Sequence, residues 1–171
     1  DALDRILSII DDLATHGIQI AHLDIGGGVG IFYQDEQVIN LKEYAAAVDL
    51  PLIVDGRYLL TEFLTEALRH DRIRCEGCYE MRLREAARQA IQSACDAFST
   101  TLLVSPYQKH ELIRTVGERV ASEFGLPFLY LDFRPGWQQG VQISRERQMY
   151  RQPYCGCIFS EEDRYAKQIA R

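Results

Sequence analysis

Residues 98–133 read FSTTLLVSPYQKHELIRTVGERVASEFGLPFLYLDF, and this stretch decides the fold. Its Thr-rich, apolar opening over 98–104 predicts a strand. Apolar residues at helical spacing over 109–124 predict a helix that ends at Gly125. The apolar run over 128–133 predicts a second strand. Strands joined by a helix pair in parallel, so the stretch predicts a strand–helix–strand unit of an α/β domain.

The alternation of helices and strands continues on both sides of this unit, with short connections and no internal repeat. Helices are predicted over 2–16, 42–48 and 58–69 and from Cys78 onward, and strands over 18–25 and 50–54. This order predicts one layered α/β domain over residues 1–171, with a mostly parallel sheet flanked by helices. Ligands of such sheets bind at the carboxyl ends of the strands. Those ends carry Gly26–Gly30, Ser105–Gln108 and Asp132–Arg134.

The composition is that of an ordinary globular protein, and 171 residues suffice for one domain with its own core. No apolar run approaches the roughly 18 residues of a membrane helix. The chain opens Asp1-Ala-Leu-Asp4 without a basic start or a cleavage pattern, so no export signal is expected. We therefore expect a cytoplasmic protein with reduced cysteines and no membrane partner.

Charge is distributed unevenly along the chain. Residues 1–50 hold nine acidic and two basic residues, whereas residues 51–171 hold sixteen acidic and seventeen basic ones. A nucleic-acid contact is therefore expected only in the second part. Arginines gather there around two cysteine pairs, and the alternative is that they lie on solvated helix faces with interspersed acids. They are Arg69, Arg72, Arg74, Arg82, Arg84 and Arg88, and then Arg145, Arg147 and Arg151.

Four of the five cysteines form two tight pairs, Cys75-Glu-Gly-Cys78 and Cys155-Gly-Cys157. Close pairs bring thiolates together at little loop-closure cost, as a tetrahedral metal or an iron–sulfur cluster requires. Buried thiols or a redox disulfide are the alternatives. Because Cys78 opens a predicted helix near several arginines, the thiols are expected to ionise more readily than free cysteine. Cys95 is expected to be a small core residue, and no histidine is predicted to be a ligand.

Several motifs follow one another between residue 50 and the C-terminus. They are Arg74-Cys-Glu-Gly-Cys-Tyr79, Arg82-Leu83 with Ala87 and Ala90, Phe98-Ser-Thr-Thr-Leu-Leu-Val-Ser-Pro-Tyr-Gln108, Leu131-Asp-Phe-Arg134 and Tyr150-Arg-Gln-Pro-Tyr-Cys-Gly-Cys-Ile-Phe-Ser160. Through this ordered set, about residues 50–171 resemble the QueH family of epoxyqueuosine reductases. A lone CxxC motif would be weak grounds for such an assignment, whereas the ordered set is specific.

The resemblance implies an oxidoreductase of tRNA processing and queuosine biosynthesis. Such an enzyme removes the epoxide oxygen of epoxyqueuosine in the anticodon loop of tRNA, with electrons from an electron donor. The resemblance also implies a Rossmann-like fold and a [4Fe–4S] cluster with a neighbouring metal ion, iron, held largely by cysteines. Carried over to this chain, the cysteine ligands are Cys75, Cys78, Cys155 and Cys157. Asp132 is the carboxylate expected nearest the metal, with a strand-end turn or cap as the alternative.

Three tyrosines near these motifs suit a substrate whose base is displaced from its stack. Stacking on that base is one interpretation of Tyr107, Tyr150 and Tyr154, with nearby arginines on phosphate. A core or structural position is the alternative for each tyrosine.

The first 48 residues carry a different set of motifs. These include Asp1-Ala-Leu-Asp4, Asp11-Asp-Leu-Ala14, His22-Leu-Asp-Ile-Gly-Gly-Gly-Val-Gly-Ile31 and Glu43-Tyr-Ala45. The segment resembles part of the PLP-dependent diaminopimelate decarboxylases, in which the triple-glycine loop cradles the cofactor phosphate with backbone amides. Lys42, Lys109 and Lys167 lack the context of a Schiff-base lysine, so no PLP chemistry is expected. The glycines are expected to form a tight turn, with phosphate binding as the alternative.

The chain is therefore expected to join two fragments, 1–48 and 49–171, in one α/β domain whose first strand–helix unit is atypical. The QueH family carries further cysteines in an N-terminal loop, and no cysteine precedes Cys75 here. Four thiolates suffice for one cluster but not for a second cysteine-bound metal, so we expect cluster binding with impaired turnover. The alternative is a non-catalytic four-cysteine zinc module that binds RNA or protein.

Overall fold

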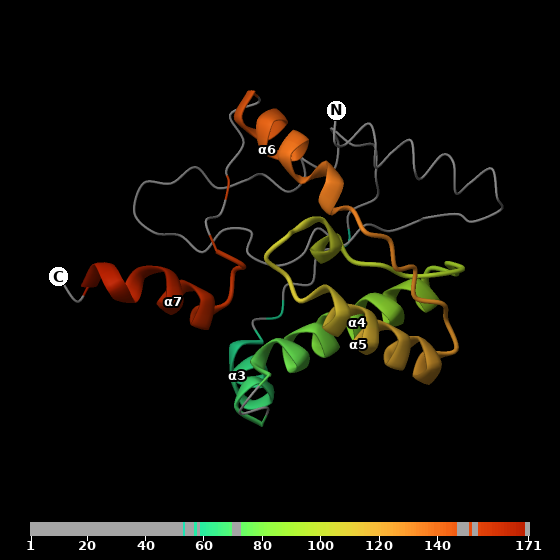
Figure 1. Ribbon diagram of the computed structural model, residues 1–171. Helices are drawn as coiled ribbons and strands as arrows, with labels where there is room; N and C mark the ends of the chain where they lie inside the picture. The colour runs from blue at the N-terminus through green and yellow to red at the C-terminus, as the bar shows by residue number, and fades with distance from the viewer. Residues whose placement is uncertain are drawn as a thin grey trace.

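The computed structural model describes residues 53, 57, 59–69, 73–146, 151 and 154–169, with side chains up to residue 166 in the last stretch. The predictions for residues 1–52 lie outside the described residues, among them the decarboxylase-like segment and its glycine loop. The described residues form five α-helices and two 3-10 helices (Figure 1). These are α3 (Leu60–Arg69), α4 (Arg74–Gln92), η1 (Thr101–Val104), α5 (His110–Phe124), η2 (Arg134–Gly136), α6 (Trp137–Glu146) and α7 (Ile158–Ile169).

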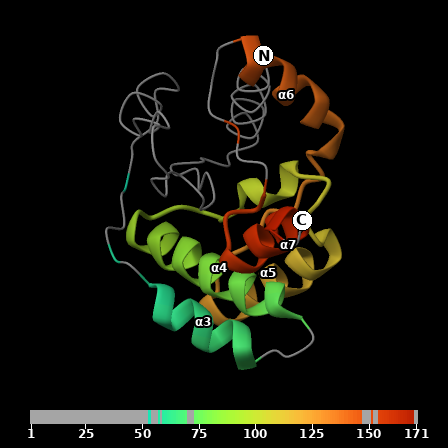
Figure 2. The ribbon, with the colours of Figure 1, turned by 90° about the vertical axis from the view of Figure 1, so that its left-hand side faces the viewer.

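Helices α4 and α5 pack along each other and form the core, as Figure 2 shows from the side of α7. Each helix places apolar residues on one face, which the partner helix covers. The buried residues are Tyr79, Leu83, Ala87 and Ala90 of α4, Ile113, Val116 and Val120 of α5, and Phe98 and Leu103 of the connection. Helical spacing in the sequence predicts one apolar face of α4 with Leu83, Ala86, Ala87, Ala90 and Ile91. The structure confirms this inward face except at Ile91, which lies in the last turn of α4 and is 48% exposed.

The close approach of α5 to the segment that follows it depends on Gly117. A Cβ atom at Gly117 would lie 2.3 Å from both Cδ1 and Cε1 of Phe128, so the phenyl ring occupies the space that a side chain would need. The ring of Phe128 also packs against that of Phe98, with 5.2 Å between centroids. Helix α5 ends as predicted at Gly125, whose φ of 64° is left-handed and whose N–H donates to the carbonyl of Ala121.

One parallel β-bridge joins the two strands predicted in the stretch 98–133. The N–H of Phe98 donates to the carbonyl of Pro127 at 3.0 Å, and the N–H of Leu129 donates to the carbonyl of Phe98 at 2.8 Å. Helix α5 connects the two segments, which gives the predicted order of the unit. Within the described residues the pairing does not extend beyond this bridge. The mostly parallel sheet of a Rossmann-like α/β domain therefore stays a prediction.

The predicted strand over 98–104 is wrong in its second half, because Thr101–Val104 form the 3-10 helix η1. Oγ1 of Thr100 accepts a hydrogen bond of 3.3 Å from the N–H of Leu102 and so caps η1. Threonine favours strands through its branched side chain, but its oxygen also bonds locally to the backbone and turns it. Here the turn inserts Leu103 into the core, where it is fully buried.

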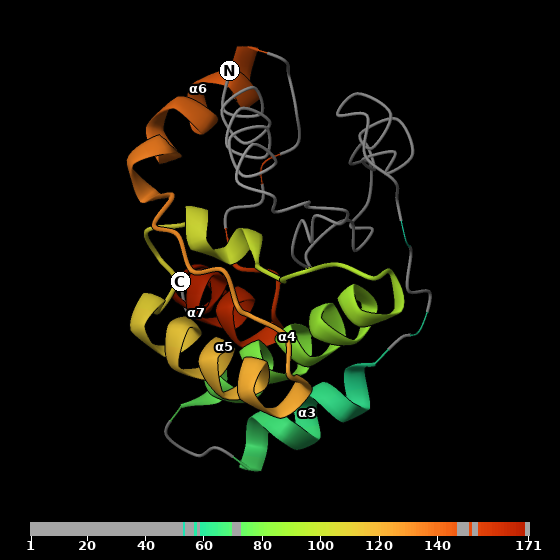
Figure 3. The same cartoon turned by 90° about the vertical axis from the view of Figure 1, so that its right-hand side faces the viewer.

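The remaining helices differ in how they meet the α4–α5 pair. Helix α3 packs on α4 and confirms the helix predicted over 58–69, with its start at Leu60. In Figure 3, η1 lies between the α4–α5 pair and α6. Helix α7 begins beside α3 and points away from the pair (Figure 1). None of the helices in the described part of the chain has the length and apolarity needed to cross a bilayer.

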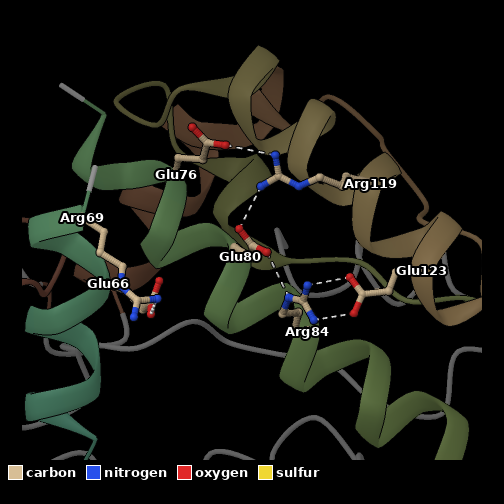
Figure 4. A network of polar contacts seen from close by, with 7 residues as sticks. All are labelled: Glu66, Arg69, Glu76, Glu80, Arg84, Arg119 and Glu123. Atoms are coloured by element: carbon tan, nitrogen blue, oxygen red, sulfur yellow. Dashed lines mark hydrogen bonds and ion pairs between the residues drawn. The ribbon is translucent and has the colours of Figure 1, made fainter. Parts of the chain in front are cut away.

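Ion pairs connect α4 with α5 along their exposed edge (Figure 4). Arg119 of α5 donates to Glu76 at 3.0 Å and to Glu80 at 2.9 Å. Arg84 of α4 donates to Glu80 at 3.0 Å and, through both terminal nitrogens, to Glu123 at 2.5 Å. Carboxylates thus offset these arginines, which favours the interpretation of solvated helix faces over that of a nucleic-acid contact for this edge.

Candidate functional site

The first cysteine pair lies in the first two turns of α4. The helix begins at Arg74 rather than at Cys78 as predicted, so that Cys75 and Cys78 both belong to it. Both thiols are half-buried. Burial raises the pKa of the Cys78 thiol, and the charge of the Arg82 guanidinium one turn later only partly opposes this effect. The expected readier ionisation is therefore wrong for Cys78 in the metal-free protein.

The second cysteine pair forms the loop that leads into α7. Gly156, between the two cysteines, has a φ of 87°, which residues with a side chain rarely adopt. The Sγ atoms of Cys155 and Cys157 lie 3.6 Å apart, with Cys155 as the donor. Sγ of Cys157 also accepts a hydrogen bond of 3.4 Å from the N–H of Ser160 and thereby caps the N-terminus of α7.

The two thiols of this loop differ in acidity. The hydrogen bond from Cys155 lowers the pKa of Cys157 to about 5, and the hydroxyl and amide of Ser160 add to this effect against partial burial. The same hydrogen bond from Cys155 raises that thiol's own pKa. A thiolate at the positive end of a helix is stabilised by the helix dipole. The expected readier ionisation therefore holds for Cys157 and is wrong for Cys155.

The two cysteine pairs are neighbours in space although they are far apart in the sequence. The charges of Cys157 and Cys75 both act on the thiol of Cys78 and raise its pKa. Burial raises the pKa of the Tyr79 hydroxyl, and the charges of Cys75, Cys78 and Cys155 raise it further. Among the described residues, no three Cys, His, Asp or Glu side chains have the geometry of a metal site. The pairs therefore adjoin each other without forming a closed ligand set.

Contacts of Arg74 hold the start of α7 against the start of α4. Its guanidinium carbon lies 4.6 Å from the ring centroid of Phe159, and its Nη2 lies 3.7 Å from Oδ2 of Asp163. The ring of Phe159 also packs against that of Phe63 in α3, with 6.1 Å between centroids. Residues from three helices thus fix the place of the second cysteine pair.

The donor set of the four paired cysteines fits the implied cofactor. Thiolate sulfurs are the ligands of [4Fe–4S] clusters, and four of them equally suit a structural zinc ion. Both pairs lie at helix N-termini, whose partial positive charge favours thiolates and an anionic cluster. The chemistry of these residues is therefore compatible with either metal centre.

The carboxylate of Asp132 is bound by Arg134 two residues later. It accepts hydrogen bonds from Nε at 2.8 Å, from Nη2 at 2.6 Å and from the backbone N–H of Arg134 at 3.0 Å. These hydrogen bonds hold the pKa of Asp132 at about 2. The side chain is exposed and lies near the end of the predicted strand 128–133, just before η2. This geometry matches the turn interpretation, and a role at the metal stays a prediction.

Sequence reasoning missed the role of Tyr79, the residue directly after Cys78. Its side chain is buried, and its hydroxyl donates to Oε1 of Gln108 at 2.7 Å and accepts from the N–H of Lys109 at 3.2 Å. It thereby ties the cysteine end of α4 to the loop before α5. The position of Tyr79 next to a cysteine pair was the available signal, but its partners lie too far along the chain to be inferred.

The remaining candidate residues are Cys95 and three tyrosines. Cys95 is half-buried and packs against the core cluster, which confirms its prediction as a small core residue. Tyr107 is exposed, whereas Tyr154 is half-buried and packs against Tyr165, with 6.1 Å between ring centroids. Tyr150 lies outside the described residues.

The N-terminal segment is similar to decarboxylases, as its motifs indicate. The family model of the pyridoxal-binding domain of pyridoxal-dependent decarboxylases matches residues 1–53. A diaminopimelate decarboxylase of Neisseria meningitidis is 58% identical over 48 residues, which cover 28% of this chain and 12% of that protein. The similarity therefore concerns a short piece of a much larger enzyme.

The larger part of the chain is similar to epoxyqueuosine reductases. The family model "Epoxyqueuosine reductase QueH" matches residues 33–163, a start further upstream than the predicted boundary near residue 50, so that the two matches overlap over 33–53. The QueH protein of Dehalococcoides mccartyi is 32% identical over 127 residues, which cover 74% of this chain and 70% of that protein. The QueH protein of Thermotoga maritima is 40% identical over 96 residues, and this chain spans 50% of its length. The chain belongs to the QueH family of epoxyqueuosine reductases, a family of oxidoreductases.

Proposed function

We propose that this chain reduces epoxyqueuosine in tRNA and that Cys75, Cys78, Cys155 and Cys157 hold a [4Fe–4S] cluster. The observation that supports the proposal is the contact of the starts of α4 and α7 through Arg74 and Phe159, since each of these helix starts carries one cysteine pair. The proposed reaction comes from the family, whose members are named epoxyqueuosine reductases. We infer that the protein works in the cytoplasm, where thiols stay reduced.

The reaction requires two electrons and two protons to convert an epoxide into an alkene and water. A cluster held by the four paired cysteines would supply electrons one at a time, and a neighbouring metal ion would polarise the leaving oxygen. The protein holds its ligands in place through α4 and through the Cys157 cap of α7. An external one-electron carrier is the electron donor in this proposal, and the anticodon loop of tRNA is the partner.

The rate of the reaction is a separate part of the proposal. The sequence holds five cysteines, and four of them belong to the two pairs. A second metal ion would therefore need other ligands, among which the exposed Asp132 is the candidate carboxylate. Loss of a Lewis acid costs several kcal/mol of transition-state stabilisation, so we propose that turnover is at least about a thousandfold slower than with both metals.

Anaerobic reconstitution of the full chain with iron and sulfide tests the cluster. We expect a brown protein with about four iron and four sulfide ions per chain. The variants Cys78→Ala and Cys157→Ala should lose the colour, whereas Cys95→Ala should keep it, because Cys95 packs against the core instead. A colourless protein that takes up one zinc ion would contradict the proposal and support the zinc module.

A single-turnover assay on epoxyqueuosine-containing tRNA with a strong chemical reductant tests the reaction. Slow conversion by the brown protein, abolished by Cys78→Ala, is the expected result. Conversion as fast as that of the Thermotoga maritima relative would contradict the impaired rate, and no conversion at all would contradict the reductase function.

A further inference from the structure

The most exposed large apolar side chain in the described part of the chain is that of Tyr107, at 83%. It lies in the loop between η1 and α5. Its ring meets that of Trp137, the first residue of α6, edge to face with 5.9 Å between centroids. Despite this contact, most of the Tyr107 side chain is open to solvent. An aromatic ring presented in this way offers a surface for stacking.

The loop that carries Tyr107 is held rigidly by its flanks. Tyr79 bonds to Gln108 and to the N–H of Lys109, as described above. On the other side, Nε2 of the buried His110 lies 3.0 Å from the carbonyl oxygen of Ser105, and so donates to it. A pre-ordered loop loses little conformational entropy when a ligand binds, so binding energy is not spent on ordering it.

This loop adjoins the cysteine pairs through Tyr79. That residue directly follows Cys78 in α4. Its hydroxyl bonds to the loop that carries Tyr107. The loop that carries Tyr107 is therefore tied to the end of α4 that bears Cys75 and Cys78.

The charges around the loop decide which kind of contact is made. Lys109 and Glu111 are both exposed beside it, and Asp132 is compensated by Arg134. Among the described residues, the charges beside the loop thus nearly cancel, which gives no strong attraction to phosphate. Stacking on aromatic side chains is the main sequence-tolerant contact of single-stranded nucleic acids besides charge.

We propose that Tyr107 is a stacking platform for an unpaired nucleobase of the RNA substrate, at the edge of the cysteine site. The proposal rests on the proposed function, since it names a contact of the same tRNA. A base that has left its helical stack is the ligand that fits, because only such a base exposes its faces to a side chain.

The experiment measures binding of two unmodified RNAs to the full chain. One is an anticodon stem-loop, and the other is the same stem closed into a fully paired duplex. Trp137 is the only tryptophan and touches Tyr107, so its fluorescence reports binding at this loop. We expect the stem-loop to bind more tightly than the duplex and to change the Trp137 fluorescence.

Variants separate stacking from mere apolar contact. Tyr107→Phe should bind as the wild type does, whereas Tyr107→Leu should bind the stem-loop roughly five- to a hundredfold more weakly. This loss should be the same at low and high salt, because phosphate contacts do not carry it. Leu68→Ala, on α3 and 66% exposed, is the matched control and should bind normally.

The outcomes distinguish this inference from the proposed function. Normal stem-loop binding by Tyr107→Leu would overturn the stacking role and leave the reductase function intact. Failure of the wild type to bind the stem-loop would overturn the stacking role and the tRNA substrate together. Since Tyr107 is exposed, unchanged thermal unfolding of the variants is expected and shows that folding is not the cause.

Discussion

The guanidinium carbon of Arg74 lies 4.6 Å from the ring centroid of Phe159, so the first residue of α4 stacks on the second residue of α7. Such a contact contributes about 0.5–1 kcal/mol at a partly exposed site. We expect Arg74→Gln to lower overall stability by about 1 kcal/mol or less. Its larger effect should be on hydrogen exchange, as measured by mass spectrometry. The exchange rate of the α7 amides should rise in the variant by more than that of the α4 amides.

A control separates the stacking of Arg74 from its ion pair. Asp163 is 72% exposed, and exposed ion pairs contribute little. We therefore expect Asp163→Asn to leave the exchange of α7 nearly unchanged. Equal effects of Asp163→Asn and Arg74→Gln would show that charge, and not the ring contact, holds α7.

The variant Gly117→Ala should destabilise the protein, although alanine is the better helix former. In an open helix the change would gain about 1 kcal/mol. Here the new methyl group would meet the ring of Phe128 at 2.3 Å, and such overpacking typically costs about 1–3 kcal/mol. Urea unfolding measures the difference. Gly136→Ala should be nearly neutral, because nothing lies within 4 Å of a Cβ there, and a stable Gly117→Ala variant would contradict the contact.

The variant Tyr79→Phe should loosen the loop before α5. It removes the hydroxyl that bonds to Gln108 and to the N–H of Lys109, at a cost of about 1–3 kcal/mol for groups left without a partner. Tyr130→Phe is the matched control, because its contact with Nδ1 of His110 is long, at 3.5 Å. Urea unfolding and exchange of the amide of Lys109 test this. Equal losses in both variants would contradict the anchoring role of Tyr79.

The ion pairs around Glu80 should make stability depend on pH. Partial burial raises the pKa of Glu80, but hydrogen bonds and charges from Arg84 and Arg119 outweigh it and hold the pKa below its usual value. The stabilisation is therefore present above the unfolded pKa of about 4.3 and is lost as the pH falls through the lower folded value.

The test compares urea unfolding of wild type and Glu80→Gln at neutral pH and near pH 3. We expect the variant to lose less stability on acidification, with a difference of about 1 kcal/mol or less. Glu118→Gln, which removes an exposed pair within α5, is the control and should change the acid response less. High salt should shrink the difference, and a salt-independent result would argue against ion pairs as its origin.

Local periodicity was sufficient to predict α3, α4 and α5 and most of the buried faces of α4 and α5, whereas α6 and α7 were not predicted. Val116 and Val120 are buried because helical spacing carries them to one side of α5. The turn at Thr100 was not predictable from propensity, because it depends on one side-chain oxygen that competes with a strand partner. The start of α4 at Arg74 was missed because no capping side chain marks it.

The candidate site shows the same division between local and distant information. The two cysteine pairs are visible in the sequence as short motifs, and the family resemblance implied that they bind one cofactor together. The contact of Arg74 with Phe159 and the bonds of Tyr79 to Gln108 join residues that no local pattern relates. Such contacts follow from tertiary packing, and only the structure reveals them.

The two cysteine pairs belong to parts of the protein that differ in their attachment. Cys75 and Cys78 lie on a helix of the core, whereas Cys155 and Cys157 lead into α7, which contacts α4 and α3, among the described residues, through Arg74 and Phe63. A cofactor bound to all four would act as a crosslink that closes a long loop of chain. Limited proteolysis should therefore cut near α7 in the empty protein and spare it in the loaded one. Cofactor occupancy would then determine how long each protein molecule survives in the cell, because proteases would cleave the cofactor-free form.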